Sequence, residues 1–117
     1  MTIEQFYDKI GADYAEVLSR LGSESLIKRI ALRFLSDPTF RELTEGFAEK
    51  DAEKAFRAAH TLKGVCSNLG FNRLQVPAFD LTEKLRGRTF DVPGTEELYN
   101  EVKKEYLFLT EALAEVQ

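Results

Sequence analysis

Apolar residues recur at three- and four-residue intervals along nearly the whole chain, and no segment alternates apolar and polar residues as a half-buried strand does. Capping residues and helix breakers divide this pattern into seven segments: a short helix from Thr2 to Gly11, a second from about Ala12 to Leu21, a third after Ser23, a fourth from Asp37-Pro38, a fifth from Asp51 to Gly70, a sixth from about Asn72 to Arg86, and a last helix from about Thr95. Four of the segments are long and amphipathic, and their connections are short. The sequence therefore predicts an all-α fold, an antiparallel four-helix bundle with additional short N-terminal helices.

Three local signals refine the predicted helix ends. Thr2 and Gln5 have the spacing of a capping box. Asp37 can cap the fourth helix, where Pro38 suits the first position because its missing N–H would be unpaired there. Pro77 falls within the sixth segment, and a proline inside a helix removes a backbone hydrogen bond. We therefore expect a kink or a late helix start at Pro77.

Composition limits the classes of function. The chain has 117 residues, of which 44% are hydrophobic, as expected for a single domain over residues 1–117 with one core. Its net charge of −4 lacks the basic excess of a nucleic-acid-binding protein. The single cysteine and single histidine exclude an internal disulfide and a zinc site of Cys and His ligands. With no secretory signal and no apolar run of about 20 residues, we expect a cytoplasmic protein without a membrane segment.

The one histidine, His60, lies on the polar side of the predicted fifth helix. At roughly 100° per residue, the apolar residues of this helix gather on the opposite side: Ala55, Ala58, Leu62, Val65, Cys66 and Leu69. A lone histidine is most often a satisfied core or surface residue, but the core position is excluded here by the helical wheel. An exposed imidazole is partly neutral at pH 7 and then has a free nucleophilic nitrogen.

The residues around this imidazole are of the kind that would stabilise an anion bound beside the ring. Gly64 lies one turn further on, and glycine inside a helix costs about 1 kcal/mol relative to alanine, so we expect it to leave the ring uncovered. Lys63, Arg57 and Ser67 place cations and a hydroxyl around the ring, where they would stabilise a bound anion. Phe56 falls on the same exposed side. A contact with the short N-terminal helix and the docking of a partner explain Phe56 equally well.

The segment Ala59-His60-Thr61-Leu62-Lys63-Gly64, followed by Asn68-Leu69-Gly70, closely resembles the signature of histidine phosphotransfer (HPt) domains. The resemblance covers most of the chain and includes Arg20-Leu21-Gly22, Phe34, Leu43, Asp51, Leu74 and Leu81. It implies a bundle whose exposed histidine accepts a phosphoryl group from the aspartyl phosphate of one receiver domain and passes it to the aspartate of another. Carried over by position, His60 is the phosphorylation site, Lys63 the neighbouring cation and Gly64 the small residue that gives access.

The resemblance also implies partners and cofactors. The partners would be receiver domains of a hybrid histidine kinase and of a response regulator, and the protein would be a monomer. Magnesium would belong to the receiver, so this chain is expected to hold no cofactor or metal of its own. Because the chain has no P-loop, we expect a phosphotransfer intermediate without autonomous ATP-dependent kinase activity.

Individual residues extend or depart from the family pattern. Arg86 stands where relatives often have a basic residue. It joins Phe56, Arg57 and Ser67 as a candidate for partner docking or phosphoryl stabilisation. Thr82 stands where a larger polar residue, often Glu or Gln, is common, so the resemblance does not define the hydrogen bonding beside the ring.

Two other classes of function are compatible with the sequence. A helical adaptor would dock a partner through the Phe56/His60 face without chemistry. An enzyme would use His60 as a general base, although no convincing carboxylate partner lies on the same face. The dimerisation helix of a histidine kinase is a related interpretation, but such helices usually have Glu after the histidine, where this chain has Thr61, and a later Pro.

Overall fold

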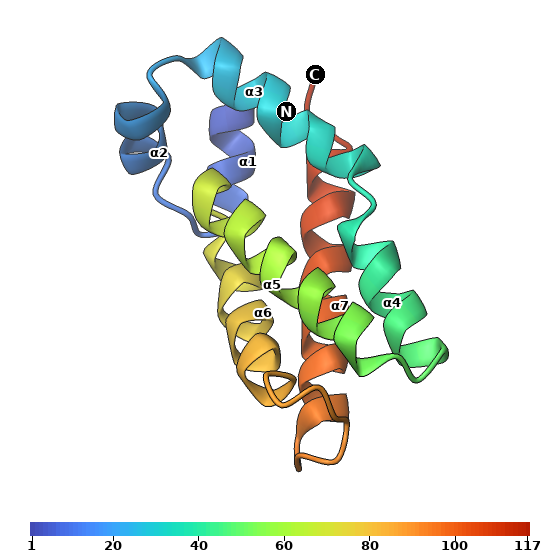
Figure 1. Ribbon diagram of the computed structural model, residues 1–117. Helices are drawn as coiled ribbons and strands as arrows, with labels where there is room; N and C mark the ends of the chain where they lie inside the picture. The colour runs from blue at the N-terminus through green and yellow to red at the C-terminus, as the bar shows by residue number, and fades with distance from the viewer.

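Seven α-helices and one 3-10 turn make up the computed structural model, which describes residues 1–117. The elements are α1 (Ile3–Lys9), α2 (Tyr14–Leu21), α3 (Glu24–Arg33), η1 (Phe34–Ser36), α4 (Thr39–Ala48), α5 (Ala52–Leu69), α6 (Asn72–Lys84) and α7 (Thr95–Leu113). Helices α4 to α7 form a bundle in which successive helices run antiparallel, and α1, α2 and α3 gather at one end of it (Figure 1). The prediction of an all-α bundle with additional N-terminal helices is confirmed.

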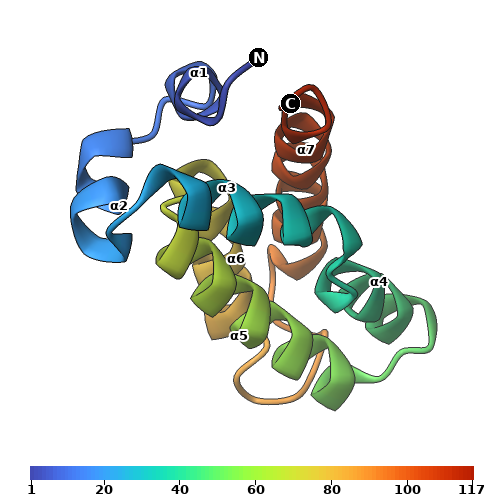
Figure 2. The ribbon, with the colours of Figure 1, turned by 90° about the horizontal axis from the view of Figure 1, so that it is seen from above.

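The end of the bundle that carries the N-terminal helices also holds both chain termini. Seen from above, α3 crosses this end of the bundle, and the N-terminus lies near the C-terminal end of α7 (Figure 2). The amino group of Met1 donates to the Glu115 carbonyl at 2.9 Å, and the Gln117 N–H donates to the Met1 carbonyl at 3.0 Å. These two hydrogen bonds join the first residue to the last turn of the chain.

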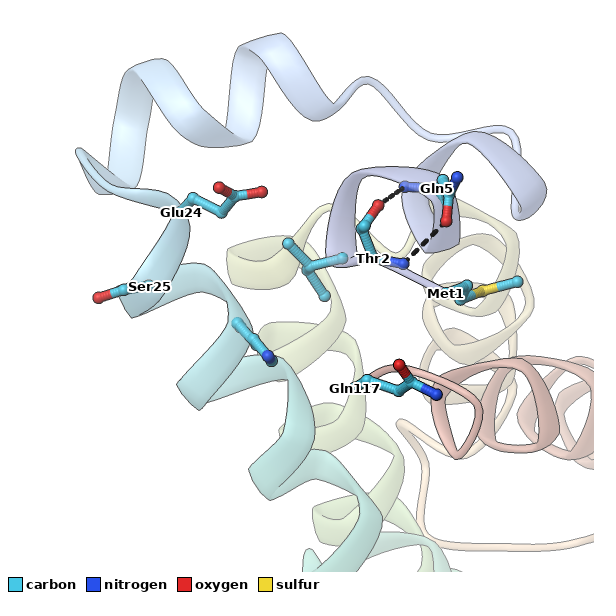
Figure 3. Close-up of a pocket in the computed structure, with 8 residues that line it drawn as sticks. Met1, Thr2, Gln5, Glu24, Ser25 and Gln117 are labelled. Atoms are coloured by element: carbon cyan, nitrogen blue, oxygen red, sulfur yellow. Dashed lines mark hydrogen bonds between the residues drawn. The ribbon is translucent and has the colours of Figure 1, made fainter.

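Most of the predicted caps are present, but the start of the fourth helix differs: Pro38 is the capping position, α4 begins at Thr39, and Asp37 accepts from the Thr39 N–H at 2.8 Å. The Thr2 hydroxyl accepts from the Gln5 N–H at 3.1 Å while the Gln5 side chain accepts from the Thr2 N–H at 2.9 Å, which completes the capping box at the start of α1 (Figure 3). Asp51 accepts from the Lys54 N–H at 3.1 Å and begins α5. Gly70 ends α5 with a φ of +73°, a left-handed conformation that favours glycine.

The structure differs from the helical pattern of the sequence at two places. The apolar repeat of the third segment continues to Phe34 and Leu35, but the helix ends at Arg33 and the chain continues as the 3-10 turn η1, where Leu35 is 42% exposed. The sixth helix begins at Asn72, as predicted, and continues through Pro77 to Lys84, which excludes a late start at the proline. Pro77 is itself buried among the inner residues of α6, and this packing stabilises the helix despite the missing N–H.

A single hydrophobic core extends from α1 to the residues after α7. Helix α5 packs directly against α4 and α6, whereas aromatic rings bridge the wider space between α4 and α7. Phe40 stacks on Tyr106 with ring centroids 4.1 Å apart, and Phe47 stacks on Tyr99 at 4.4 Å. The stacked rings therefore connect α4 to α7. The small buried residues of α5 allow closer packing of α5 against α4 and α6. None of the helices has both the length and the apolar character needed to cross a membrane.

The carbonyls at the C-terminal end of α5 are satisfied by the N-terminal helices. The last carbonyls of a helix have no partner within the helix itself. The Tyr7 hydroxyl of α1 donates to the Leu69 carbonyl at 2.6 Å, and the Arg20 guanidinium of α2 donates to the Asn68 carbonyl at 2.8 Å. Burial raises the pKa of Tyr7 well above its ordinary value, so the hydroxyl keeps the proton that it donates. Helices α1 and α2 thus supply the hydrogen-bond donors that the last carbonyls of α5 lack within the helix.

Gly46 sets the distance between α4 and α5. A methyl group at this position would lie 2.8 Å from the backbone nitrogen of Ala55 and 2.9 Å from its Cα. Because both atoms belong to the backbone of the facing helix, no side-chain rotation relieves the overlap. The two helices can pack this closely only because Gly46 has no side chain.

We predict that Gly46→Ala lowers the free energy of unfolding by about 1–3 kcal/mol, the usual cost of overpacking a core. Gly64→Ala is the matched control because no atom of another part of the protein lies within 4 Å of the added methyl group, so the gain in helix propensity of up to about 1 kcal/mol should appear. Urea unfolding followed by circular dichroism measures both. Equal stabilities for the two variants would contradict the close approach of α4 and α5.

Candidate functional site

His60 projects into solvent from the middle of α5. The buried residues of this helix lie on its other sides: Ala55, Phe56, Ala58, Ala59, Leu62, Cys66 and Leu69. This matches the predicted buried face, except that Val65 is half-buried and Phe56 and Ala59 are buried as well. Neither ring nitrogen of His60 forms a hydrogen bond within the protein. Both nitrogens are therefore open to a reactant from outside.

Phe56, predicted to be exposed, is only 8% exposed. Its ring lies under two guanidinium groups, with the Arg88 Cζ 3.7 Å and the Arg86 Cζ 5.6 Å from the ring centroid. Neither arginine belongs to the short N-terminal helix that the sequence suggested as a contact. The helical wheel fails here because both arginines come from the turn after α6, which a wheel of α5 does not include.

Gly64 lies on the exposed side of α5 beside His60, as predicted. No atom of another part of the protein lies within 4 Å of the position where its Cβ would stand. Gly64 is therefore not required for helix packing, in contrast to Gly46. Its effect at this position is to leave open space one helical turn from the imidazole.

Most cations near His60 are paired with carboxylates. Arg57, which is 72% exposed in its side chain, lies 3.4 Å from Glu53, and Arg86 lies 2.7 Å from Glu83. The hydrogen bond from Arg86 lowers the pKa of Glu83, and the charge of Lys63 acts in the same direction. Both arginines thus have a carboxylate partner before any ligand arrives, although Glu53 is shared with Arg88.

Lys63 is the exception among these cations, because its ammonium group forms no ion pair. It is half-buried rather than fully exposed, and its Nζ lies 5.7 Å from the ring centroid of Phe79 on α6. The aromatic ring attracts the ammonium charge without neutralising it. Lys63 is therefore the cation at this site with the most uncompensated charge.

The hydroxyl of Thr82 cannot serve the imidazole. Thr82 is completely buried, and its Oγ1 donates to the Ala78 carbonyl one turn earlier in α6 at 2.7 Å. A hydroxyl has one proton, and this one bonds to a backbone carbonyl. No side chain of α6 replaces it as a hydrogen-bond partner of the ring.

The other nucleophile of α5, Cys66, faces the core. Its thiol is buried, and burial raises its pKa to about 12, so it stays protonated and unreactive at neutral pH. Ser67, the next residue, is exposed and forms no side-chain hydrogen bond. Among the candidate groups of α5, only His60 combines access to solvent with a nucleophilic lone pair, since a serine hydroxyl without an adjacent base is a weak nucleophile.

An open groove of about 920 Å³ borders the site between α2, α5 and α6. Lys63, Gly64 and Ser67 form one wall, and Arg20 and Phe79 lie on the others. A second hollow, of about 580 Å³, lies beside the start of α1, the start of α3 and the C-terminus (Figure 3). None of the predicted site residues lines this second hollow.

The sequence did not identify Arg88 or Phe79 as parts of this region. Phe79 is 47% exposed on α6, where an isolated aromatic residue carries no signal of its own. Arg88 lies in the turn after α6 with a φ of +58°, and a turn residue cannot be placed on a helical wheel. Its position over Phe56 depends on the path of that turn in space.

The fold and the site define a class of protein, an antiparallel helical bundle that presents one unbonded imidazole from a central helix. The family model of the Hpt domain matches residues 24–117, most of the chain and all the candidate site residues. The chain therefore belongs to the Hpt domain family, whose members are histidine phosphotransfer carriers of phosphorelays and generally interact with receiver domains. Comparisons with curated proteins and with solved structures gave no match. Helices α1 and α2 lie before the matched residues.

Proposed function

We propose that this protein carries a phosphoryl group on His60, between the aspartyl phosphate of one receiver domain and the aspartate of another. The main support is that the only histidine of an Hpt-family chain stands exposed on α5 with both ring nitrogens unbonded. The partners would be receiver domains of a hybrid histidine kinase and of a response regulator. Neither an adaptor nor a general-base enzyme is favoured by a specific observation at the site.

The proposed chemistry requires little of this chain beyond the ring itself. A lone pair of the neutral imidazole attacks the phosphorus of the aspartyl phosphate in line with the leaving oxygen. The N–P bond forms as the bond from phosphorus to the carboxyl oxygen breaks, and the aspartate leaves as a carboxylate with that electron pair. The other ring nitrogen keeps its proton. Attack by the carboxylate of a second receiver reverses these steps and restores the neutral imidazole.

Lys63 and Gly64 would support this transfer in different ways. A phosphoryl group adds nearly two negative charges at neutral pH, and the unpaired ammonium of Lys63 is one turn from the ring. Gly64 would leave room for the loops of a receiver to reach His60. Arg57, Ser67 and Arg86 are exposed around the same side and would contact the partner or the phosphoryl group. Phe56 would act from beneath the surface, because it is buried.

We also propose that residues 1–117 act as one domain, with α1 and α2 as additions to the matched region. The support is the single core, in which Phe6 and Tyr7 of α1 are buried together with residues of every bundle helix. Edge-to-face contacts join Phe6 to Tyr7 at 5.4 Å and to Phe71 at 5.7 Å. Removing the first helix would therefore uncover aromatic residues of the common core.

We predict that His60→Gln abolishes phosphorylation by a phosphorylated receiver, while the helical circular dichroism signal stays native. The substitution removes the only imidazole, and the exposed position leaves the core unchanged. Acid-labile, base-stable label on the wild-type protein measures phosphohistidine. Label that persists on the variant would assign the phosphoryl group to another residue, and a wild-type protein without label would favour the adaptor.

For Lys63→Ala we expect transfer from the receiver to slow by about tenfold, because an uncompensated cation next to the phosphoryl group is lost. The unfolding free energy should change by less than about 1 kcal/mol, since the substitution removes only the contact with Phe79 and a solvent-screened attraction to Glu83. Lys54→Ala is the matched control, with the same charge change on the same helix but at a residue that is paired with Glu49 and is not among the candidate site residues. Equal slowing in both variants would indicate a general effect of net charge.

Gly64→Gln should separate stability from transfer. The open space around Gly64 accommodates the side chain, so the melting temperature should hold or rise as glycine is removed from the helix. Transfer should fall, because a long side chain one turn from His60 reaches the imidazole and the approaching receiver. Gly64→Ala, which adds only a methyl group, should transfer at nearly the wild-type rate. A normal rate for the glutamine variant would exclude a role for Gly64 in access.

A further inference from the structure

The orientation of the His60 ring depends on one neighbour. With no hydrogen bond at either nitrogen, the only ring contact of the imidazole is the Phe56 side chain one turn earlier, at 6.1 Å between centroids and 15° between planes. Thr82 does not hydrogen-bond to the ring, because its hydroxyl donates to the Ala78 carbonyl. The near-parallel offset stack with Phe56 is therefore the one aromatic interaction available to restrain the imidazole.

Phe56 is in turn held in place by Arg88. The guanidinium carbon of Arg88 lies 3.7 Å from the Phe56 ring centroid, a direct stack, whereas that of Arg86 is more distant at 5.6 Å. Phe56 is only 8% exposed although it lies on the same side of α5 as His60. The Arg88 guanidinium therefore covers the Phe56 ring and shields it from solvent.

Arg88 is itself restrained from two sides. Its Nε donates to Glu53 on the first turn of α5 at 2.8 Å, and its Nη1 donates to the backbone carbonyl of Arg86. The Arg88 backbone has a φ of +58°, which directs the side chain from the turn after α6 back towards α5. A continuous series of contacts thus extends from Glu53 through Arg88 and Phe56 to His60.

We propose that Arg88 is a positioning residue for phosphotransfer, acting through Phe56 to hold the His60 imidazole in one orientation. This inference rests on the proposed function of His60 as the phosphoryl carrier. Its physical basis is that in-line attack requires an aligned lone pair, so a ring that rotates freely spends less time in the reactive geometry. Because Arg88 is already paired with Glu53, it acts by stacking rather than as a free charge.

Arg88→Asn tests the proposal without disturbing the turn, because asparagine tolerates a positive φ better than most residues. In the unphosphorylated protein, the imidazole proton signals of His60 are unambiguous, since there is no other histidine. We expect them to move towards random-coil shifts and to lose their nuclear Overhauser effects to Phe56. We expect the maximal transfer rate to fall about tenfold at saturating receiver, with the half-saturating receiver concentration nearly unchanged.

Comparison variants test whether Arg88 acts on His60 through Phe56. Phe56→Leu should have the same effect on transfer, and the double variant Arg88→Asn/Phe56→Leu should be no slower than Phe56→Leu alone, since both residues act through one contact. Arg88→Lys keeps the charge but not the planar stack, so its transfer should stay slow.

Arg73→Asn is the matched control. Arg73 lies 4.1 Å from the ring centroid of Phe108 and 3.0 Å from Glu105, away from His60, so its loss should reduce stability and leave transfer unchanged.

Unchanged His60 signals or an unchanged maximal rate in Arg88→Asn would overturn the proposal. So would full recovery in Arg88→Lys, or effects of Arg88→Asn and Phe56→Leu that multiply in the double variant, because either result assigns Arg88 a role independent of the stack. A comparable slowing in Arg73→Asn would also overturn it, since the loss would then follow stability. A wild-type protein that takes up no phosphoryl group refutes the proposed function instead, and the ring signals then still report whether Arg88 orients His60.

Discussion

The rotation of α5 about its own axis is the constraint on which the site depends. This helix packs against α4 on one side and α6 on another, and its small and apolar residues are buried there. At roughly 100° per residue, a change of one position in the buried face would move His60 from solvent towards a neighbouring helix. The close contact of Gly46 with the backbone of Ala55 holds α4 and α5 together and so helps to fix this rotation. The exposure of His60 is thus a consequence of core packing.

The C-terminal end of α5 receives hydrogen bonds from helices that lie outside the region matching the Hpt family. Tyr7 and Arg20 bond to the last carbonyls of α5, and both belong to the N-terminal segment that precedes the matched residues. A cation at the C-terminal end of a helix also interacts favourably with the helix dipole. Helices α1 and α2 therefore supply hydrogen bonds to the helix that presents the histidine. Helix α2 also forms one wall of the groove beside Lys63.

The electrostatics of the site come from how charges are paired more than from how many there are. Glu53 bridges Arg57 and Arg88, while Glu83 binds Arg86. Exposed pairs of this kind contribute little to stability, about 0–1 kcal/mol each. Their larger effect is to reduce the charge that three arginines would otherwise offer to an anion, which leaves Lys63 as the unpaired cation.

The sequence by itself determined the helices, most of their caps and the side of α5 on which His60 lies, because these follow from backbone hydrogen bonding and periodicity within one segment. It also contained the HPt signature, which the family match confirms. Only the tertiary structure decided that Phe56 and Thr82 are buried and that Arg88 stacks over Phe56. These features depend on the path of the turn after α6 and on contacts between residues far apart in the chain. A helical wheel contains neither, because it describes each helix without its neighbours.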